Sequence, residues 1–475
     1  MSIKKYISEK DTTIADAYKA DLKTRSTDAN LGASDSLEVF SIYGQASQNS
    51  LEKSRILVQF PIDQLVADRS DSKIPQSGSV NFFFRLFNVE HPFSLPKNYT
   101  LDIYPLAQQW DEGYGLDMEG YQDRGWNDLL SGYGATWKYA TSGTLWSSDG
   151  GYFLTSSQYH KTAYFKTGVE DIEVDITNIV EDWASNTLPN CGLVVKLTND
   201  EEDGTNFTSY YTKKFSSNTS QFFYKRPSIE ARWAAVVQDD RNNFYASSSA
   251  LEASDNTMNL YYFNKPRGVL KNIVGNVLPD VSFYADESLT NEITPDYKSI
   301  SNPIAGVYKV QVAIDTTASV LYDKWYNTSS LSTYFTDSFD VNPVNGYNND
   351  SESEYVINIT NLKNIYTDKE AARFKIFSRK KDWNPTIYTI ANSSVENSVI
   401  NNLYYKIFRF SDNYVIIDYS TGSLPYSKTS YDSQGNYFDL DMSLLEKNYG
   451  YGIKLAVYDG LQLKEFSKIF KFRVE

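Results

Sequence analysis

The stretch Val307-Tyr-Lys-Val-Gln-Val-Ala-Ile314 shows the pattern that decides the fold of this 475-residue chain. Its apolar side chains recur at every second position, with Lys309 and Gln311 between them. Successive side chains of a β-strand point to opposite faces, so a period of two predicts a strand with one buried and one solvent-facing side. Antiparallel sheets commonly have one such solvated face. We therefore expect this stretch to lie in an antiparallel sheet.

The same alternation recurs along the chain. It is found at residues 172–176, 193–197, 453–457 and 470–474, with turns rich in Asn, Asp, Gly and Ser between the stretches. One short helix is expected after Asp175 or Thr177, either of which suits an N-cap, and it places Ile179, Val180 and Trp183 on one face. The 38 Tyr and 26 Phe against 4 Met also favour strands. The sequence predicts an all-β chain of tandem antiparallel β-sandwiches.

Length and shifts in composition indicate three domains. At roughly 100–200 residues per domain, a chain of this length holds about two to four of them. Six of the eight tryptophans precede residue 236, and residues 239–254 form a polar connector. A second cluster of turn and charged residues spans 342–353. We predict a first sandwich over residues 1–235 and two Ig-like sandwiches over 236–345 and 346–475.

Charge and residue counts exclude several classes of function. Lys and Arg total 45 against 60 Asp and Glu, a net charge of −15, which argues against binding to nucleic acid or to anionic membranes. The lone Cys191 excludes an internal disulfide framework and multi-cysteine zinc sites, and His91 and His160 are the only histidines. No apolar stretch is long enough for a signal peptide or a membrane span. We expect no catalytic residue, metal, cofactor or membrane insertion.

Short motifs follow one another in a recognisable order over the first half of the chain. They are Lys10-Asp-Thr-Thr-Ile14, Asn30-Leu-Gly32, Arg55-Ile-Leu-Val-Gln-Phe60, Trp110-Asp-Glu-Gly113, Thr136-Trp137, Trp146 with Gly150-Gly151, Asp175 to Trp183, Asn190-Cys-Gly-Leu-Val-Val195 and Arg226-Pro-Ser-Ile-Glu-Ala-Arg-Trp233. In this order they resemble the DNRLRE family of carbohydrate-binding-module-like, jelly-roll β-sandwiches. The chain departs from that family at residues 215–220, where an acidic residue is often found, and in a long insertion at 112–162.

The resemblance implies a domain used for attachment or surface decoration. Such domains occur in secreted proteins that associate with polysaccharides and in virion proteins of tailed bacteriophages. The missing signal peptide and the scarcity of cysteine favour the second group. We therefore expect a non-enzymatic virion protein of the tail, baseplate, neck or capsid surface, assembled in the host cytoplasm with other virion proteins and oligomeric in that assembly. The alternatives are an adhesin module that binds host or cell-surface glycans and, less favoured, a glycan-degrading enzyme.

The insertion holds the candidate contact residues. Its aromatic rings stand among Gly, Asp and Ser, a mixture typical of binding loops. The candidates for contact with a glycan or a protein partner are Tyr114, Tyr121, Trp126, Tyr133, Trp137, Tyr139 and Trp146. These rings either stack on sugars or, as we favour, hold the loop together and form a protein interface.

The remaining polar candidates have simpler explanations. Acidic residues of the insertion offer paired carboxylates or calcium ligands, but a solvated acidic loop explains them equally well; they are Asp111, Glu112, Asp117, Glu119 and Asp123. We expect His160 to be a surface or turn residue and Cys191 to be a small packing residue. The run Asp200-Glu-Glu-Asp-Gly204 is expected to be a solvated hairpin tip.

Overall fold

The computed structural model describes residues 2–19, 21–27, 29–71, 73–116, 134–268, 270–342, 355–381 and 397–475. Strands account for 43% of the chain and helices for 9%, so the predicted all-β fold is confirmed. The chain forms two compact units, Ile3–Trp233 and Ala234–Glu475. Of the predicted contact residues, Tyr121, Trp126 and Tyr133 lie outside the described residues, as do Asp117, Glu119 and Asp123.

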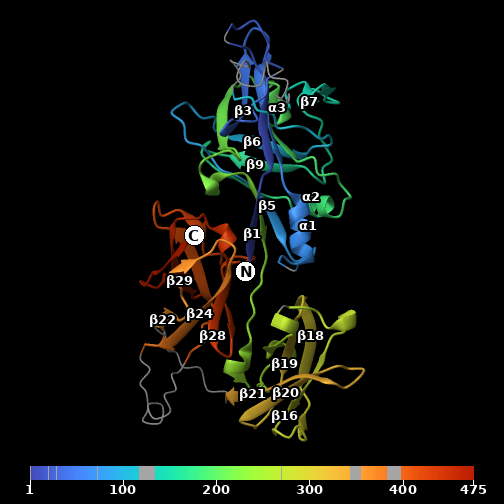
Figure 1. Cartoon of the computed structure of the whole chain (residues 1–475), viewed down its shortest axis with the longest axis vertical. Helices are drawn as coiled ribbons and strands as arrows, with labels where there is room; N and C mark the ends of the chain where they lie inside the picture. Colours follow the sequence, from blue (N-terminus) through green and yellow to red (C-terminus); the bar gives the residue numbers. More distant parts are fainter. Residues whose placement is uncertain are drawn as a thin grey trace. The chain divides into compact units, whose positions relative to one another are not determined.

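Two antiparallel sheets build the first unit (Figure 1). The four-stranded sheet has the order β1 (Ile3–Ile7), β13 (Ser228–Arg232), β5 (Asn81–Leu86) and β10 (Ile172–Asp175). The seven-stranded sheet has the order β12 (Tyr210–Ser216), β3 (Ser36–Gly44), β4 (Asn49–Gln59), β11 (Leu193–Leu197), β6 (Tyr99–Pro105) and β9 (Lys161–Phe165), and β2 (Lys10–Asp16) pairs with β4. The sheets meet at Phe84 of β5 and Phe60, whose ring centroids lie 5.9 Å apart. This pair belongs to the core of a β-sandwich.

Among the described residues of this unit, three α-helices accompany these sheets: α1 (Ile62–Ser70), α2 (Thr177–Ala184) and α3 (Asn199–Glu202). The predicted helix is confirmed as α2, and Ile179, Val180 and Trp183 form its buried face. Of the two expected cap residues, Asp175 accepts the backbone N–H of Thr177 at 2.9 Å. The hydroxyl of Thr177 instead accepts the N–H of Phe82 on β5, which fastens the helix to the four-stranded sheet.

The second unit begins with two sheets over residues 244–342. One has the order β14 (Phe244–Tyr245), β21 (Thr333–Asn342), β20 (Val320–Tyr326), β16 (Asp280–Tyr284) and β17 (Glu292–Ile293). The other has the order β15 (Met258–Phe263), β19 (Val307–Ala313) and β18 (Tyr297–Ile304). The alternation predicted for β19 is confirmed, because Tyr308, Val310 and Val312 are all buried. They pack with Trp325 of β20 in one apolar core.

Two further sheets follow over residues 355–475. One has the order β22 (Tyr355–Ile359), β24 (Ala371–Lys380), β28 (Gly435–Asp441) and β27 (Ser430–Asp432). The other has the order β23 (Ile365–Tyr366), β31 (Phe470–Val474), β29 (Gly450–Tyr458), β25 (Leu403–Arg409) and β26 (Val415–Ile417), with β30 (Leu463–Glu465) on β29. Phe374 stacks on Phe438 within the first sheet and contacts Phe472 of the second. These rings join the two sheets.

The start of the predicted polar connector is a buried structural segment. Val237 and Asp239 exchange main-chain hydrogen bonds with Tyr431 of β27. Arg241 donates to Asp323 of β20 at 2.6 Å and to the carbonyl of Tyr261 at 2.9 Å. The segment therefore contacts strands of both sandwiches of the second unit.

Gly192 offers a test of the first unit's packing. Its φ is +87°, and a Cβ there would lie 2.4 Å from the carbonyl oxygen of Val58 on β4. We expect Gly192→Ala to destabilise the protein much more than Gly143→Ala, because Gly143 also has a positive φ but has no atom within 4 Å of its Cβ position. The control isolates the left-handed backbone cost of about 1–2 kcal/mol. Chemical denaturation measures both, and equal losses would contradict the steric explanation.

Candidate functional site

The described parts of the connection between β6 and β9, residues 106–116 and 134–160, cover the second face of the seven-stranded sheet. Leu57 of β4 and Val194 of β11 pack there with Trp110, Trp137 and Trp146 of the connection. Because the sheet is covered on both faces, every residue of β11 is buried, including Lys196. The described part of the predicted insertion therefore packs as a third layer of this unit.

The described tryptophans of this connection are internal. Trp110, Trp137 and Trp146 are 1%, 6% and 4% exposed. Nε1 of Trp110 donates to the carbonyl of Cys191, and Nε1 of Trp146 donates to the carbonyl of Thr136, both at 2.9 Å. A buried indole satisfied in this way has a packing role. As the chain is folded, a ligand reaches neither Trp137 nor Trp146.

Arg55 fastens this layer to the sheet. Its Nε and Nη2 donate to the two carboxylate oxygens of Glu202 at 2.6 and 2.7 Å, and its Nη1 donates to the carbonyl of Gly150 at 2.7 Å. The guanidinium also lies over the Trp137 ring, 5.0 Å from its centroid. The planar fork of arginine suits such simultaneous contacts. Arg55 thus joins β4, α3 and the β6–β9 connection.

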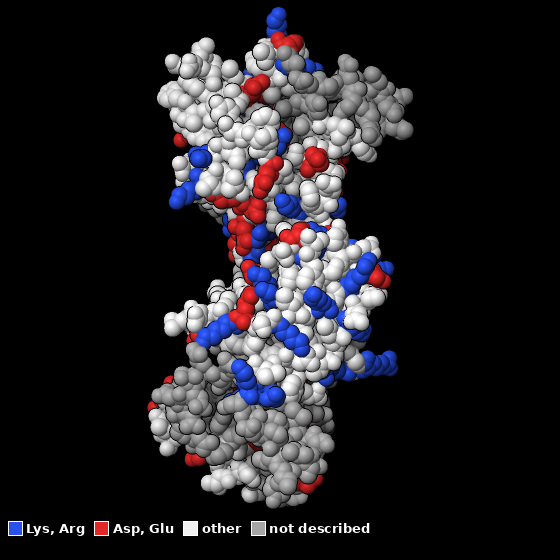
Figure 2. Space-filling view, turned by 90° about the vertical axis from the view of Figure 1, so that its left-hand side faces the viewer, with Lys and Arg blue, Asp and Glu red and all other residues white. Residues whose placement is uncertain are grey.

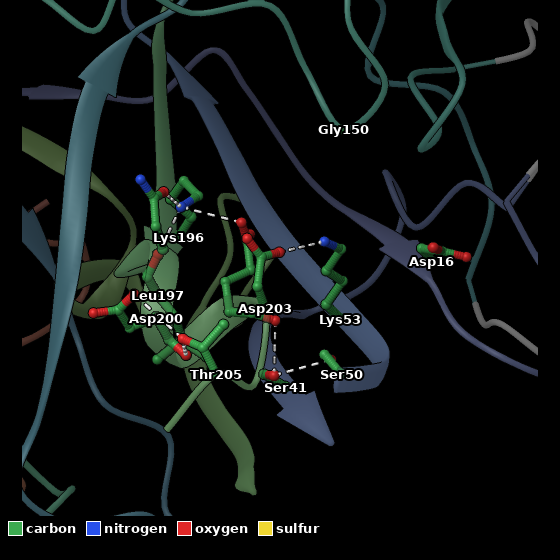
Figure 3. A network of polar contacts seen from close by, with 12 residues as sticks. Asp16, Ser41, Ser50, Lys53, Gly150, Lys196, Leu197, Asp200, Asp203 and Thr205 are labelled. Atoms are coloured by element: carbon green, nitrogen blue, oxygen red, sulfur yellow. Dashed lines mark hydrogen bonds and ion pairs between the residues drawn. The ribbon is translucent and has the colours of Figure 1, made fainter. Parts of the chain in front are cut away.

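Glu202 is the anionic centre of this network. Figure 3 shows the neighbouring Lys196, Ser41 and Asp203. Burial alone would raise its pKa, but hydrogen bonds and charges from Arg55 and Lys196 outweigh burial and lower the pKa. Lys196 lies 3.1 Å from the Glu202 carboxylate, and burial lowers the pKa of this lysine. The main-chain carbonyl of Glu202 accepts the hydroxyl of Ser41 at 3.0 Å. The network ties α3 to β3, β4 and β11.

The prediction that residues 200–204 form a solvated hairpin tip is wrong for Glu202. This residue ends helix α3 and is 2% exposed, because its charge is compensated by two cations inside the unit. Asp203 next to it fits the prediction better, with a side chain 57% exposed and an ion pair to Lys53 at 3.0 Å. The charge run therefore contains both an internal and a surface carboxylate.

In the described part of the β6–β9 connection, Tyr114 and Leu116 are exposed, and so, beyond residue 134, are Tyr139, Leu145 and Tyr152. The last three belong to or adjoin one hairpin. We call them the insertion patch. Tyr139 and Leu145 are register partners in the hairpin of β7 (Tyr139–Thr141) and β8 (Thr144–Leu145). Gln108 donates to the carbonyl of Leu145 at 2.9 Å, and the N–H of Ala107 donates to the carbonyl of Tyr152 at 2.8 Å. Neighbouring backbone segments thus hold the patch.

The other predicted residues are placed as follows. Tyr114 is 60% exposed, and Asp111 is exposed as well. His160 is partly exposed; its Nε2 lies 2.8 Å from Oδ1 of Asp102, and its ring stacks on Tyr104. Cys191 is buried in the apolar cluster beneath the connection, which confirms its packing role. Glu112 is half-buried, and its Oε1 accepts the backbone N–H of Asp11 on β2 at 2.9 Å.

A charged face lies on β24. Arg373 and Lys375 are exposed and alternate with the buried Phe374 and Ile376. Lys and Arg side chains gather in this part of the chain (Figure 2). Arg373 donates to both carboxylate oxygens of Asp439 at 2.7 and 3.0 Å, and Lys375 donates to Gln434 at 2.8 Å. These cations have polar neighbours on their own sheet.

Within the described ranges, no group of three or more His, Cys, Asp or Glu side chains is arranged to hold a metal ion. In the same part of the chain, none of the helices has the length and apolar character that crossing a bilayer requires.

Comparison with known proteins gives little further information. No family model matches the chain, and no curated protein matches it. Among solved structures, one match is the Yersinia pseudotuberculosis adhesin InvE, with 11% sequence identity and a TM-score of 0.16. The match covers 49% of this chain and 56% of that structure, so this chain spans about half the length of the adhesin. At this TM-score the match supports no functional inference.

The Arg55–Glu202 pair gives a second testable expectation. Glu202→Gln removes a buried partner of two cations, and we expect it to cost about 3–5 kcal/mol of unfolding free energy. Because the folded pKa of Glu202 is lowered, its stabilisation is present above the unfolded pKa of about 4.3 and is lost as the pH falls through the folded value. Urea denaturation across the acid range measures both effects.

Asp203→Asn is the matched control. Asp203 adjoins Glu202 but is exposed, so the change should cost about 0–1 kcal/mol. Similar losses in the two variants would show that the buried network contributes no more than a surface ion pair.

Proposed function

We propose that this chain is a non-enzymatic structural protein of a tailed-bacteriophage virion, in the tail, baseplate, neck or capsid surface, and that it acts through contacts with other virion proteins. The insertion patch carries this proposal. Its three side chains are exposed, while Trp110, Trp137 and Trp146 of the same connection are buried. An ordered loop whose outer side presents tyrosine and leucine has the character of a protein interface.

The rigidity of the patch supports docking. Association costs free energy when loops and side chains become ordered, so a surface that is already fixed retains more of its contact energy. Next to the β7–β8 hairpin, the indole N–H of Trp146 donates to the carbonyl of Thr136. The side-chain amide of Gln108 donates to the carbonyl of Leu145. Hydrogen bonds within the connection therefore hold the hairpin that carries Tyr139 and Leu145.

Free sheet edges support the proposed oligomeric assembly. β18 ends the three-stranded sheet, and most of its eight residues are exposed or partly exposed. β9 ends the seven-stranded sheet and carries Tyr164, which is 61% exposed. Strand edges of this kind can pair with another chain. Tandem sandwiches are typical of attachment proteins. Domains of the DNRLRE family, which the first half of the chain resembles, are typical of them too.

The alternative is a carbohydrate-binding adhesin module. Tyr114, Tyr139 and Tyr152 are exposed on the β6–β9 connection, and tyrosine offers a flat apolar face with a polar edge that suits sugar rings. This favours host or cell-surface glycans as the second candidate ligand, with the same surface as the site.

The test combines mass spectrometry of purified particles with replacement of the patch. We expect the chain to be an abundant particle constituent. A variant with Tyr139→Ser, Leu145→Ser and Tyr152→Ser should be incorporated at least tenfold less, because about 1.4 kcal/mol of lost contact energy is a factor of ten. Circular dichroism checks that the variant is folded.

Tyr211→Ser is the control, since Tyr211 is 55% exposed on β12 and does not belong to the patch. Absence of the chain from particles would refute the virion role. Normal incorporation of the triple variant would refute the patch as the contact surface. Binding of the wild type on a glycan array, lost in the triple variant, would instead support the adhesin.

A further inference from the structure

A buried lysine of the first unit has an asparagine amide against its amine. Lys213, on β12, is 0% exposed. Its Nζ lies 2.5 Å from Oδ1 of Asn88 and donates to the main-chain carbonyls of Gly168 at 2.8 Å and Glu170 at 3.1 Å. Within the described part of the chain, no carboxylate forms an ion pair with this amine. An ammonium without a counter-ion is costly to bury, so this environment favours the neutral amine.

Two aromatic rings lie close to the same amine. Nζ of Lys213 is 4.8 Å from the centroid of the Phe215 ring and 5.3 Å from that of Phe165. Burial lowers the pKa of Lys213 to about 8, although the charges of Asp171 and Glu170 oppose this shift. Near neutral pH, part of the lysine is therefore the neutral amine, which is a nucleophile.

Lys196 on β11, which is also buried, shows the contrast. Its Nζ lies 3.0 Å from Oδ1 of Asn199, but it also lies 3.1 Å from the carboxylate of Glu202. That carboxylate stabilises the ammonium form, whose nitrogen has no electron pair to share. Lys213 differs from Lys196 because its neighbours are carbonyls, an amide and aromatic rings.

The amide of Asn88 is held beside this amine by the fold. Asn88 is the bridge partner of Phe215, which is two residues from Lys213 on β12. Oδ1 of Asp171 accepts the main-chain N–H of Asn88 at 2.7 Å. Two reactive groups that are held in contact in this way react as if at very high concentration.

We propose that Lys213 and Asn88 form an intramolecular isopeptide bond. The electron pair of Nζ attacks Cγ of Asn88, a C–N bond forms, and the bond between Cγ and Nδ2 breaks. A proton from Nζ passes to the departing nitrogen, which leaves as ammonia past the partly exposed Asn88. An amine and a primary amide thus become a secondary amide and ammonia, and the reaction needs neither an oxidant nor a co-reactant.

We assign the proton transfer to Asp171. Its carboxylate contacts the main chain of Asn88, and its charge acts on Lys213. Glu170 is less suited to this role, because its carboxylate accepts the N–H groups of Lys166, Thr167 and Gly168, which lower its pKa to about 2. A carboxylate that gives and takes a proton must not be held so firmly in its charged form.

The bond would close the first unit covalently. Asn88 follows β5 of the four-stranded sheet, and Lys213 belongs to β12 at the edge of the seven-stranded sheet. A link between residues 125 positions apart restricts the unfolded chain as a disulfide does, but it needs no cysteine and resists reduction. This inference does not rest on the proposed virion function, because it concerns the isolated chain.

Mass spectrometry of the purified full chain tests the proposal. We expect an intact mass below that of the sequence by about 17 Da, the mass of ammonia. Trypsin does not cleave at a substituted lysine, so the digest should contain a branched peptide in which residues 86–97 are joined to residues 197–214. Lys213→Met and Asn88→Ala should each have the full sequence mass.

Lys214→Met is the matched control. Lys214 adjoins Lys213, but its amine pairs with Glu38 at 2.5 Å, so this variant should keep the mass deficit and the link to Asn88. Asp171→Asn keeps an oxygen for the N–H of Asn88 but cannot carry a proton. In freshly synthesised chain sampled over time, it should form the bond at least tenfold more slowly; an unchanged rate would refute the role of Asp171.

The proposal is overturned if the wild type has the full mass of its sequence, because Lys213 then only donates hydrogen bonds to its three oxygen neighbours. A deficit of the same size without the branched peptide also overturns it, since a succinimide formed at any asparagine loses ammonia too. The digest of the wild type decides between these outcomes even if the variants do not fold.

Discussion

The packing of the first unit depends on the contacts of one buried side chain, Arg55. One guanidinium contacts the carboxylate of Glu202, the carbonyl of Gly150 and the ring of Trp137. A charge this deep inside a protein is tolerated when its hydrogen bonds are all directed to partners of suitable polarity. The free-energy cost of burying the Arg55 guanidinium is offset by these contacts, which join three segments at one point. Without Arg55, α3 and the aromatic layer would lose the buried contact that joins Glu202, Gly150 and Trp137 to β4.

This arrangement explains the unusual aromatic content of the β6–β9 connection. A β-sandwich normally leaves one face of each sheet in water, but here Leu57 and Val194 on the second face are apolar and covered. Large, rigid rings fill such a layer with few residues, and Trp110 and Trp146 also satisfy main-chain carbonyls across it. The tyrosines at the hairpin then remain for the surface. In the described part of this connection, the indoles are therefore buried, whereas the phenol rings of Tyr114, Tyr139 and Tyr152 are exposed.

Local patterns in the sequence predicted the parts of the fold that local physics determines. Alternation identified β19, and spacing identified the buried face of α2, because both depend on neighbouring residues alone. The environments of Glu202 and Asp11 depend on partners 147 and 101 positions away, and no local pattern reports such pairs. Composition showed that the connection is rich in aromatic residues, but only the fold separates the buried Trp137 from the exposed Tyr139.

The pairing of β1 with β13 affects how the protein is made. Ile3 is opposite Arg232, and β1 has β13 as its neighbour in the four-stranded sheet. During translation β1 must therefore wait until nearly the whole unit has been synthesised before its partner β13 exists. Contacts so distant in sequence form slowly, and an unpaired strand is exposed to other chains in the meantime. The edge of β1 that pairs with β13 is consequently left without this partner until residue 232 has emerged.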